Sequence, residues 1–162
     1  MNRNTIAYRL TSMVFTLTFI IAGFSVNGLH TANAQSKKVK NLAGSWEVLA
    51  TTPSQGSFNV FISFFDDGNV IADEPGSQET AGHGNWLATG GTNVIYTFKS
   101  VFGDANQQVL ANLKVVGALQ YNATQDTWTG PFKVEVFDPS GHLVFSDRGT
   151  FTGTRIAIES LN

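Results

Sequence analysis

A two-residue alternation of apolar and polar side chains, repeated along the chain, is the feature that most constrains the fold. It is clearest over residues 92–102 and 108–121, where Val, Tyr, Phe and Leu occupy one set of positions and Thr, Asn, Lys and Gln the other. Successive side chains of a strand point to opposite faces, so this period predicts strands buried on one side. No segment shows a convincing helical period of 3.6 residues. The sequence therefore predicts an all-β protein.

Short turn sequences separate the alternating segments. Residues 52–56 combine Pro and Gly, and Asp67-Gly68 is the strongest hairpin signal, since a two-residue turn needs positive φ. The longest polar connector, 74–80, is expected to be a mobile lid. Seven connectors give eight strands, expected over 44–51, 57–66, 69–73, 82–87, 92–102, 108–121, 128–136 and 143–151.

Eight strands joined by short connectors form a meander that leaves two exposed edges unless it closes on itself. Closure removes both edges, and an eight-stranded barrel has an interior wide enough for side chains or one small ligand. We therefore expect an eight-stranded antiparallel up-and-down β-barrel over 42–162. A two-sheet sandwich is the alternative, but the long crossover connections typical of sandwiches are not evident.

The first 34 residues have the pattern of an export signal. Arg3 and Arg9 precede an apolar run over 13–26, and Ala32-Asn33-Ala34 matches the small-x-small site of signal peptidase. We expect residues 1–34 to be a signal peptide, 35–41 a leader, and the protein to be secreted or periplasmic. An uncleaved anchor is the alternative. After cleavage, no stable membrane anchor is expected.

Composition and motifs exclude several classes of function. Removing residues 1–34 takes away two of the ten Lys and Arg and none of the twelve Asp and Glu, which leaves a net charge of −4 and makes nucleic acid a poor partner. The chain has no Cys, and the two histidines outside the signal are far apart, so we expect no metal site. No P-loop, dinucleotide fingerprint or nucleophile elbow occurs, and no cofactor is expected.

Two elements at the ends of the predicted barrel resemble the calycin superfamily. Gly44-Ser45-Trp46 opens the first predicted strand, and Arg155 follows the last. The segment is similar to the Gly-x-Trp of lipocalins, and the chain looks like a small secreted bacterial member. The resemblance implies a barrel whose floor is Trp46 with Arg155 stacked on it, both as structural residues. Two lipocalin features are missing, because the chain has no Cys for a disulfide and only residues 157–162 remain for a C-terminal helix.

His83 and Asp147 are the candidate catalytic residues. His83 has a side chain whose ordinary pKa is near neutrality, which suits a general base or a ligand-facing donor. Strand alternation places Asp147 on the inward face beside Phe145, where an acid must be paired or have a raised pKa. The structural alternatives are an ordinary strand histidine for His83 and a water-exposed or ion-paired carboxylate at the barrel mouth for Asp147.

Large inward-facing aromatic side chains are the candidate ligand contacts: Tyr96, Phe98, Tyr121, Trp128 and Phe145. Gly117 and Ala111 share a face and are expected to leave room between these rings. The sequence thus favours an exported protein that binds a small hydrophobic molecule inside the barrel, opening beside 74–80. A cofactor-free isomerase or cyclase, of the kind found in allene oxide cyclase-like barrels, is the alternative. A third alternative is a filled barrel that acts as an interaction module.

Overall fold

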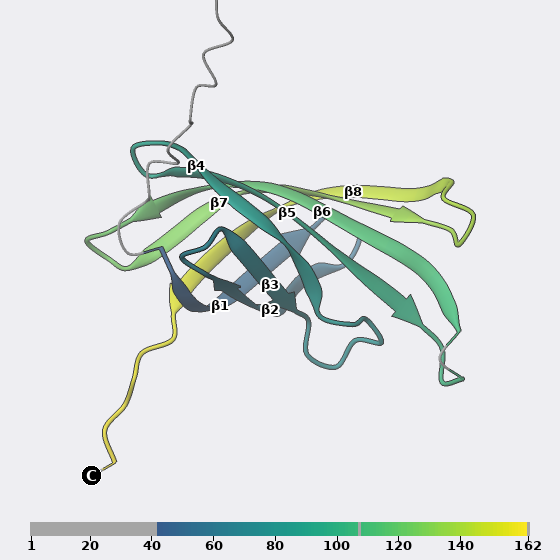
Figure 1. The fold of residues 1–162 in the computed structure, drawn as a ribbon, viewed down its shortest axis with the longest axis horizontal. Coiled ribbons are helices and arrows are strands. Elements are labelled where there is room, and N and C mark those ends of the chain that lie inside the picture. Colours follow the sequence, from purple (N-terminus) through teal and green to yellow (C-terminus); the bar gives the residue numbers. More distant parts are fainter. Residues whose placement is uncertain (1–41, 107, 162) are drawn as a thin grey trace, which may run out of the picture. The chain divides into compact units, whose positions relative to one another are not determined.

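Eight antiparallel strands form a closed barrel in the computed structural model (Figure 1), each strand pairing with its neighbours in the sequence and β8 pairing with β1. The structure describes residues 42–106 and 108–161. The strands are β1 (Gly44–Thr52), β2 (Gly56–Phe64), β3 (Asn69–Asp73), β4 (Gly82–Gly90), β5 (Asn93–Gly103), β6 (Val109–Asn122), β7 (Thr127–Phe137) and β8 (Leu143–Arg155). The prediction of an all-β, eight-stranded antiparallel barrel is confirmed.

The signal peptide and leader predicted over residues 1–34 and 35–41 lie outside the described residues. Within 42–106 and 108–161, no helix is long and apolar enough to cross a membrane.

The largest difference from the predicted strand bounds is in β8, which continues to Arg155. The sequence pattern ends at Phe151 because the next inward position is Gly153, which carries no apolar side chain. The backbone nevertheless continues the ladder, with Gly153 opposite Val48 of β1 and Trp128 of β7. These pairs join the last strand to the first.

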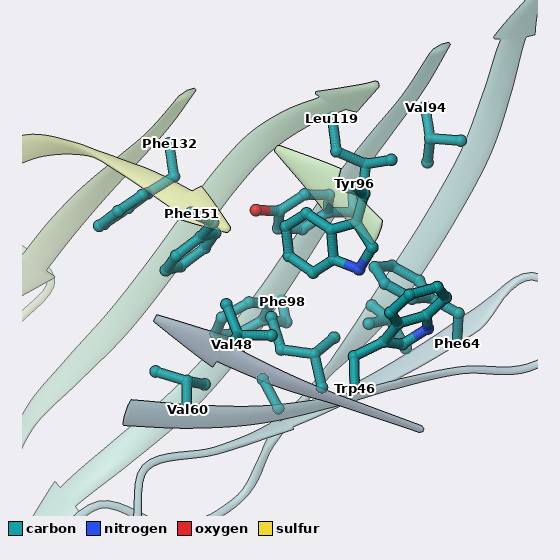
Figure 2. Close-up of a cluster of buried hydrophobic side chains, with 14 of the residues drawn as sticks. Trp46, Val48, Val60, Phe64, Val94, Tyr96, Phe98, Leu119, Phe132 and Phe151 are labelled. Atoms are coloured by element: carbon teal, nitrogen blue, oxygen red, sulfur yellow. The ribbon is translucent and has the colours of Figure 1, made fainter. Parts of the chain in front are cut away.

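The interior is filled mainly by aromatic and β-branched side chains. Alternate residues of β1 are buried from Trp46 to Thr52, as the period of two requires. Figure 2 shows this core, with the rings of Phe132 and Phe151 stacked at a centroid distance of 3.9 Å. Phe64 makes edge-to-face contacts with both Tyr96 and Trp128, an arrangement that adds attraction between rings beyond the area they bury.

Several inward-facing glycines lie directly under aromatic rings. A Cβ placed on Gly117 would come within 2.3 Å of Cζ and the hydroxyl oxygen of Tyr96. The prediction that Gly117 leaves room in the interior is therefore wrong, because the ring of Tyr96 fills that space. The same arrangement recurs across the β7–β8 ladder, where the ring of Trp128 covers Gly153 and that of Phe132 covers Gly149.

Candidate functional site

One end of the barrel is closed by Trp46. Its side chain is fully buried, and its indole Nε1 donates a hydrogen bond to the carbonyl oxygen of Leu42 at 3.1 Å. The guanidinium carbon of Arg155 lies 4.1 Å from the centroid of the Trp46 ring. A cation over an indole face contributes about 0.5–2 kcal/mol. Trp46 and Arg155 thus occupy the positions that the lipocalin resemblance implies for a barrel floor.

Arg155 is held by groups from two other parts of the chain. Its Nη1 donates to the carbonyl oxygen of Ala43 at 2.9 Å, and its Nε donates to a carboxylate oxygen of Asp126. Gly44 makes room for the guanidinium, because a Cβ there would lie 2.3 Å from Nη1 of Arg155. The glycine of Gly44-Ser45-Trp46 therefore has a packing reason, which is the approach of Arg155.

Asp126 is a structural residue that the sequence analysis missed. It adopts a left-handed backbone conformation with φ of 50°, which Asp tolerates better than most residues. Its carboxylate accepts hydrogen bonds from Arg155 and, at 2.8 Å, from the hydroxyl of Tyr121. The bond from Arg155 is the main cause that lowers the pKa of Asp126. The closed end thus contains a carboxylate with partners on both oxygens.

The opposite end holds a cavity of about 250 Å³. The strand ladders around it end at different heights, because residues 143–149 of β8 pair with β7 alone and 56–60 of β2 pair with β1 alone. Strands β5 to β8 therefore provide the taller part of the wall, as Figure 1 shows. The apolar lining side chains are Phe58, Val60, Ala72, Phe98, Phe102, Leu113, Val115, Phe132, Val134, Val136, Phe145 and Phe151.

The connector 74–80 borders this cavity, in agreement with the predicted position of the opening. It is fastened to β5, since Thr80 N donates to the carbonyl oxygen of Val101 at 2.9 Å and Glu79 forms an isolated bridge with Phe102. Together with the β1–β2 turn and the ends of β1, β3 and β5, it contributes the polar part of the lining: Thr52, Gln55, Asp73, Glu74, Ser77, Glu79, Thr80 and Ser100.

Glu79 is an acidic side chain of the cavity lining that has a hydrogen-bond partner. Its Oε1 accepts a hydrogen bond of 2.7 Å from the hydroxyl of Ser100, which is itself buried. Burial raises the pKa of Glu79, and the negative charge of Asp73 adds to the rise, while the bond from Ser100 opposes it. Burial and the charge of Glu79 likewise raise the pKa of Glu74. The cavity therefore combines apolar walls with carboxyl groups whose ionisation is disfavoured.

The five predicted ligand contacts are divided between the two ends. Phe98 and Phe145 line the cavity. Tyr121 and Trp128 pack against Trp46 at the closed end, with ring centroids 5.9 and 6.3 Å from its indole. Tyr96 is buried between these groups, in contact with Phe64, Phe98 and Phe151, and burial raises the pKa of its hydroxyl. Contact of Phe98 and Phe145 with a ligand stays a prediction.

Neither candidate catalytic residue lines the cavity. His83 is exposed on β4, opposite Ile71 and Lys99, which places it on the outer face. Asp147 has the inward parity expected of it, but its carboxylate accepts hydrogen bonds from the backbone N and hydroxyl of Ser54. These bonds lower the pKa of Asp147, with the Ser54 hydroxyl as the main cause. Asp147 is therefore a carboxylate that is hydrogen-bonded to Ser54 and lies outside the cavity lining.

Sequence reasoning missed Glu79 and Ser100. For Ser100 a signal exists, since it interrupts the apolar series Val94, Tyr96, Phe98 and Phe102 at an inward position of β5. Glu79 lies in a polar connector without periodicity, and no pattern distinguishes it from Glu74. Only the fold brings the two residues together.

Among the described residues, no group of three or more His, Cys, Asp or Glu side chains is arranged to hold a metal ion. Comparisons with family models, curated proteins and solved structures found no match to this chain. The barrel is compatible with a calycin-like fold. The geometry of the cavity is therefore the basis for assigning the candidate site.

Proposed function

We propose that this chain is an exported protein that binds one small hydrophobic molecule in the open half of its barrel. The observation that carries the proposal is the cavity of about 250 Å³ with apolar walls. An apolar cavity of about 150 Å³ already accommodates a benzene molecule, whereas pockets for drug-sized ligands span about 300–1,000 Å³. The space therefore suits a molecule with one ring or a short alkyl chain, in contact with Phe98 and Phe145.

The packing of the barrel supports the same choice of site. Trp46, Trp128 and Phe64 are almost completely buried and fill the closed half. Phe145 lines the cavity and is 45% exposed, so part of its ring is accessible from the opening. A ligand that covers this ring removes apolar surface from water, at about 25 cal/mol per Å².

Binding of 4-fluorotoluene, followed by ¹⁹F NMR, tests the proposal. We expect saturable binding to the wild type and its loss in Val134→Trp, which adds a large side chain inside the cavity. Val144→Trp is the matched control, since Val144 lies on β8 and is 61% exposed. An absence of saturable binding to the wild type rejects the proposal. Equal binding by the wild type and a folded Val134→Trp variant places the ligand elsewhere.

Export is a separate part of the proposal and rests on the sequence pattern of residues 1–34. Cleavage after Ala34 gives a mature chain that begins at Gln35. Intact-mass analysis of the protein recovered from the host's periplasm or medium measures this directly. A protein that retains residues 1–34 contradicts it.

A cofactor-free isomerase or cyclase is the second candidate, and the pairing of Glu79 with Ser100 favours it. A carboxyl group with a raised pKa inside an apolar cavity suits proton transfer to or from a bound substrate. Deuterium exchange at the carbon next to the carbonyl of phenylacetone tests this activity. Faster exchange with wild type than with Glu79→Gln supports it, and exchange at the buffer rate with both rejects it.

A further inference from the structure

The charges that line the cavity have a single sign. Three ionisable side chains border it, Asp73, Glu74 and Glu79, and all three are acids. No Lys, Arg or His of the described residues lines it. The three acids lie at the end of β3 and in the connector that follows it. The walls formed by β5 to β8 are largely apolar.

Among the described residues, no Lys, Arg or His forms an ion pair with these acids. The salt bridges within 42–106 and 108–161 are made by Asp126, Glu135 and Asp138. Glu79 has the Ser100 hydroxyl as a partner, which is neutral. Burial is the main cause that raises the pKa of Glu79 and of Glu74, and the negative charge of a neighbouring acid adds to each rise.

We propose that the cavity selects a small organic ammonium ion, with one aromatic ring or a short alkyl chain in the apolar part and its protonated amine at Glu79, Glu74 and Asp73. This inference rests on the proposed binding function and names the chemical class of the ligand. The amine supplies the positive charge that the opening lacks, and a carboxylate ligand of the same size meets repulsion there.

The geometry favours an organic cation over a metal ion. The acids do not form a group that could hold a metal, and Phe98, Phe102 and Phe145 line the same cavity. Aromatic rings tolerate a neighbouring ammonium group, because the face of the ring attracts a cation. An ammonium ion with an apolar body uses both parts of the cavity, whereas a hydrated metal ion leaves the apolar walls without a partner.

Three probes of similar size and different charge test the inference by isothermal titration calorimetry at neutral pH. They are phenethylammonium, 2-phenylethanol and 3-phenylpropanoate. We expect phenethylammonium to bind about tenfold or more tightly than 2-phenylethanol, as charge-assisted hydrogen bonds allow, and 3-phenylpropanoate to bind most weakly. The preference for phenethylammonium should decrease as salt is added, since the opening is in contact with solvent.

The variant Glu79→Gln keeps the size of the side chain and its ability to accept from Ser100, but removes the charge. We expect it to weaken phenethylammonium binding about tenfold and to leave 2-phenylethanol binding within about twofold. Glu47→Gln is the matched control, because Glu47 is exposed on the outer face of β1 and its replacement changes the net charge equally. We expect no change in binding from it.

The outcomes separate this inference from the proposed function. If 2-phenylethanol binds and phenethylammonium binds no more tightly, the preference for an ammonium ion is wrong and the apolar site stands. If none of the three probes binds, both proposals fail. Equal weakening of both ligands by Glu79→Gln shows that Glu79 shapes the cavity without selecting charge, which also overturns the inference.

Discussion

The two ends of this barrel use the same kinds of residue in opposite ways. At the closed end, Arg155 has two partners, because its guanidinium lies over the ring of Trp46 and donates a hydrogen bond to the carboxylate of Asp126. At the open end, the ionisable groups of the described residues that line the cavity are all acids, and Glu79 accepts a hydrogen bond from the neutral hydroxyl of Ser100. A set of complementary groups closes the first end, and an incomplete set leaves the second able to accept a ligand.

The comparison leads to an expectation about which end contributes to stability and which end contributes to the proposed binding. Charges that are paired within the chain need no external partner, so we expect the closed end to contribute mainly to stability. Charges that lack a partner raise the energy of the folded state unless a ligand balances them. Substitutions at the two ends should therefore separate stability from binding.

The largest effect is expected from Trp46→Ala. The indole is fully buried and contacts Tyr121 and Trp128, so its removal leaves a cavity among rings that cannot easily close it. Such substitutions cost about 3–5 kcal/mol. Phe145→Ala at the open end is the matched truncation, and we expect a loss below about 1 kcal/mol because the ring is 45% exposed. Urea denaturation measures both, and equal losses contradict the contrast between the ends.

Arg155→Ala is expected to cost about 2–3 kcal/mol, less than Trp46→Ala. The variant loses the stacking on Trp46 and hydrogen bonds to Asp126 and Ala43, and leaves the carboxylate of Asp126 with Tyr121 as its bonded partner. The same denaturation experiment gives the value. Binding of 4-fluorotoluene to the folded variant should be unchanged, since Arg155 does not line the cavity. A loss within about 0.5 kcal/mol, as for an ordinary surface residue, rejects Arg155 as part of the floor.

Gly117→Ala tests the layer between the two ends. The new Cβ would overlap the ring of Tyr96, and overpacking of this kind costs about 1–3 kcal/mol. In a Tyr96→Leu background the same change should cost clearly less, because the ring that it meets is absent. A double-mutant cycle measures this coupling. Equal costs in both backgrounds mean that Tyr96 does not fill the space above Gly117.

The fold was predictable because its signals are local. Alternation gives each strand, and turn residues such as Asp67-Gly68 give the connections, so the closed barrel follows from the need to remove edge strands. The position of Arg155 near Trp46 followed from the lipocalin resemblance. The end of β8 was not found, because Gly153 has no side chain to mark an inward position.

The candidate site was less predictable, because it depends on which rings occupy which space. The period of two correctly places Gly117 and Tyr96 on the same face of the sheet. It does not predict that the ring of Tyr96 covers Gly117. It gives Asp147 an inward parity, but not the Ser54 side chain that bonds to it from 93 residues away in the sequence. Glu79 has no periodic neighbours, so only the pairing of its connector with β5 reveals it.

Asp126 and Glu79 are expected to change stability with pH in opposite directions. Hydrogen bonds, first of all from Arg155, lower the pKa of Asp126 below its ordinary 3.8, so its contribution is present above that value and is lost as the pH falls through the lowered pKa. Burial raises the pKa of Glu79 above its ordinary 4.5, so its contribution is present below that value and is lost as the pH rises through the raised pKa.

The smallest effect that we predict is the difference between these two pH profiles. Urea denaturation of wild type, Asp126→Asn and Glu79→Gln from about pH 3 to pH 8 covers both titrations. Relative to wild type, Asp126→Asn should become more destabilising as the pH rises, because the wild-type carboxylate regains its charged bonds. Glu79→Gln should become less destabilising or stabilising over the same change, because it removes a charge whose formation burial disfavours. Glu47→Gln is the control for net charge. If the effects of the two substitutions on stability change with pH in the same direction, a positive group must stabilise the ionised carboxylate of Glu79. The contrast between a paired floor and an unpaired opening would then be wrong.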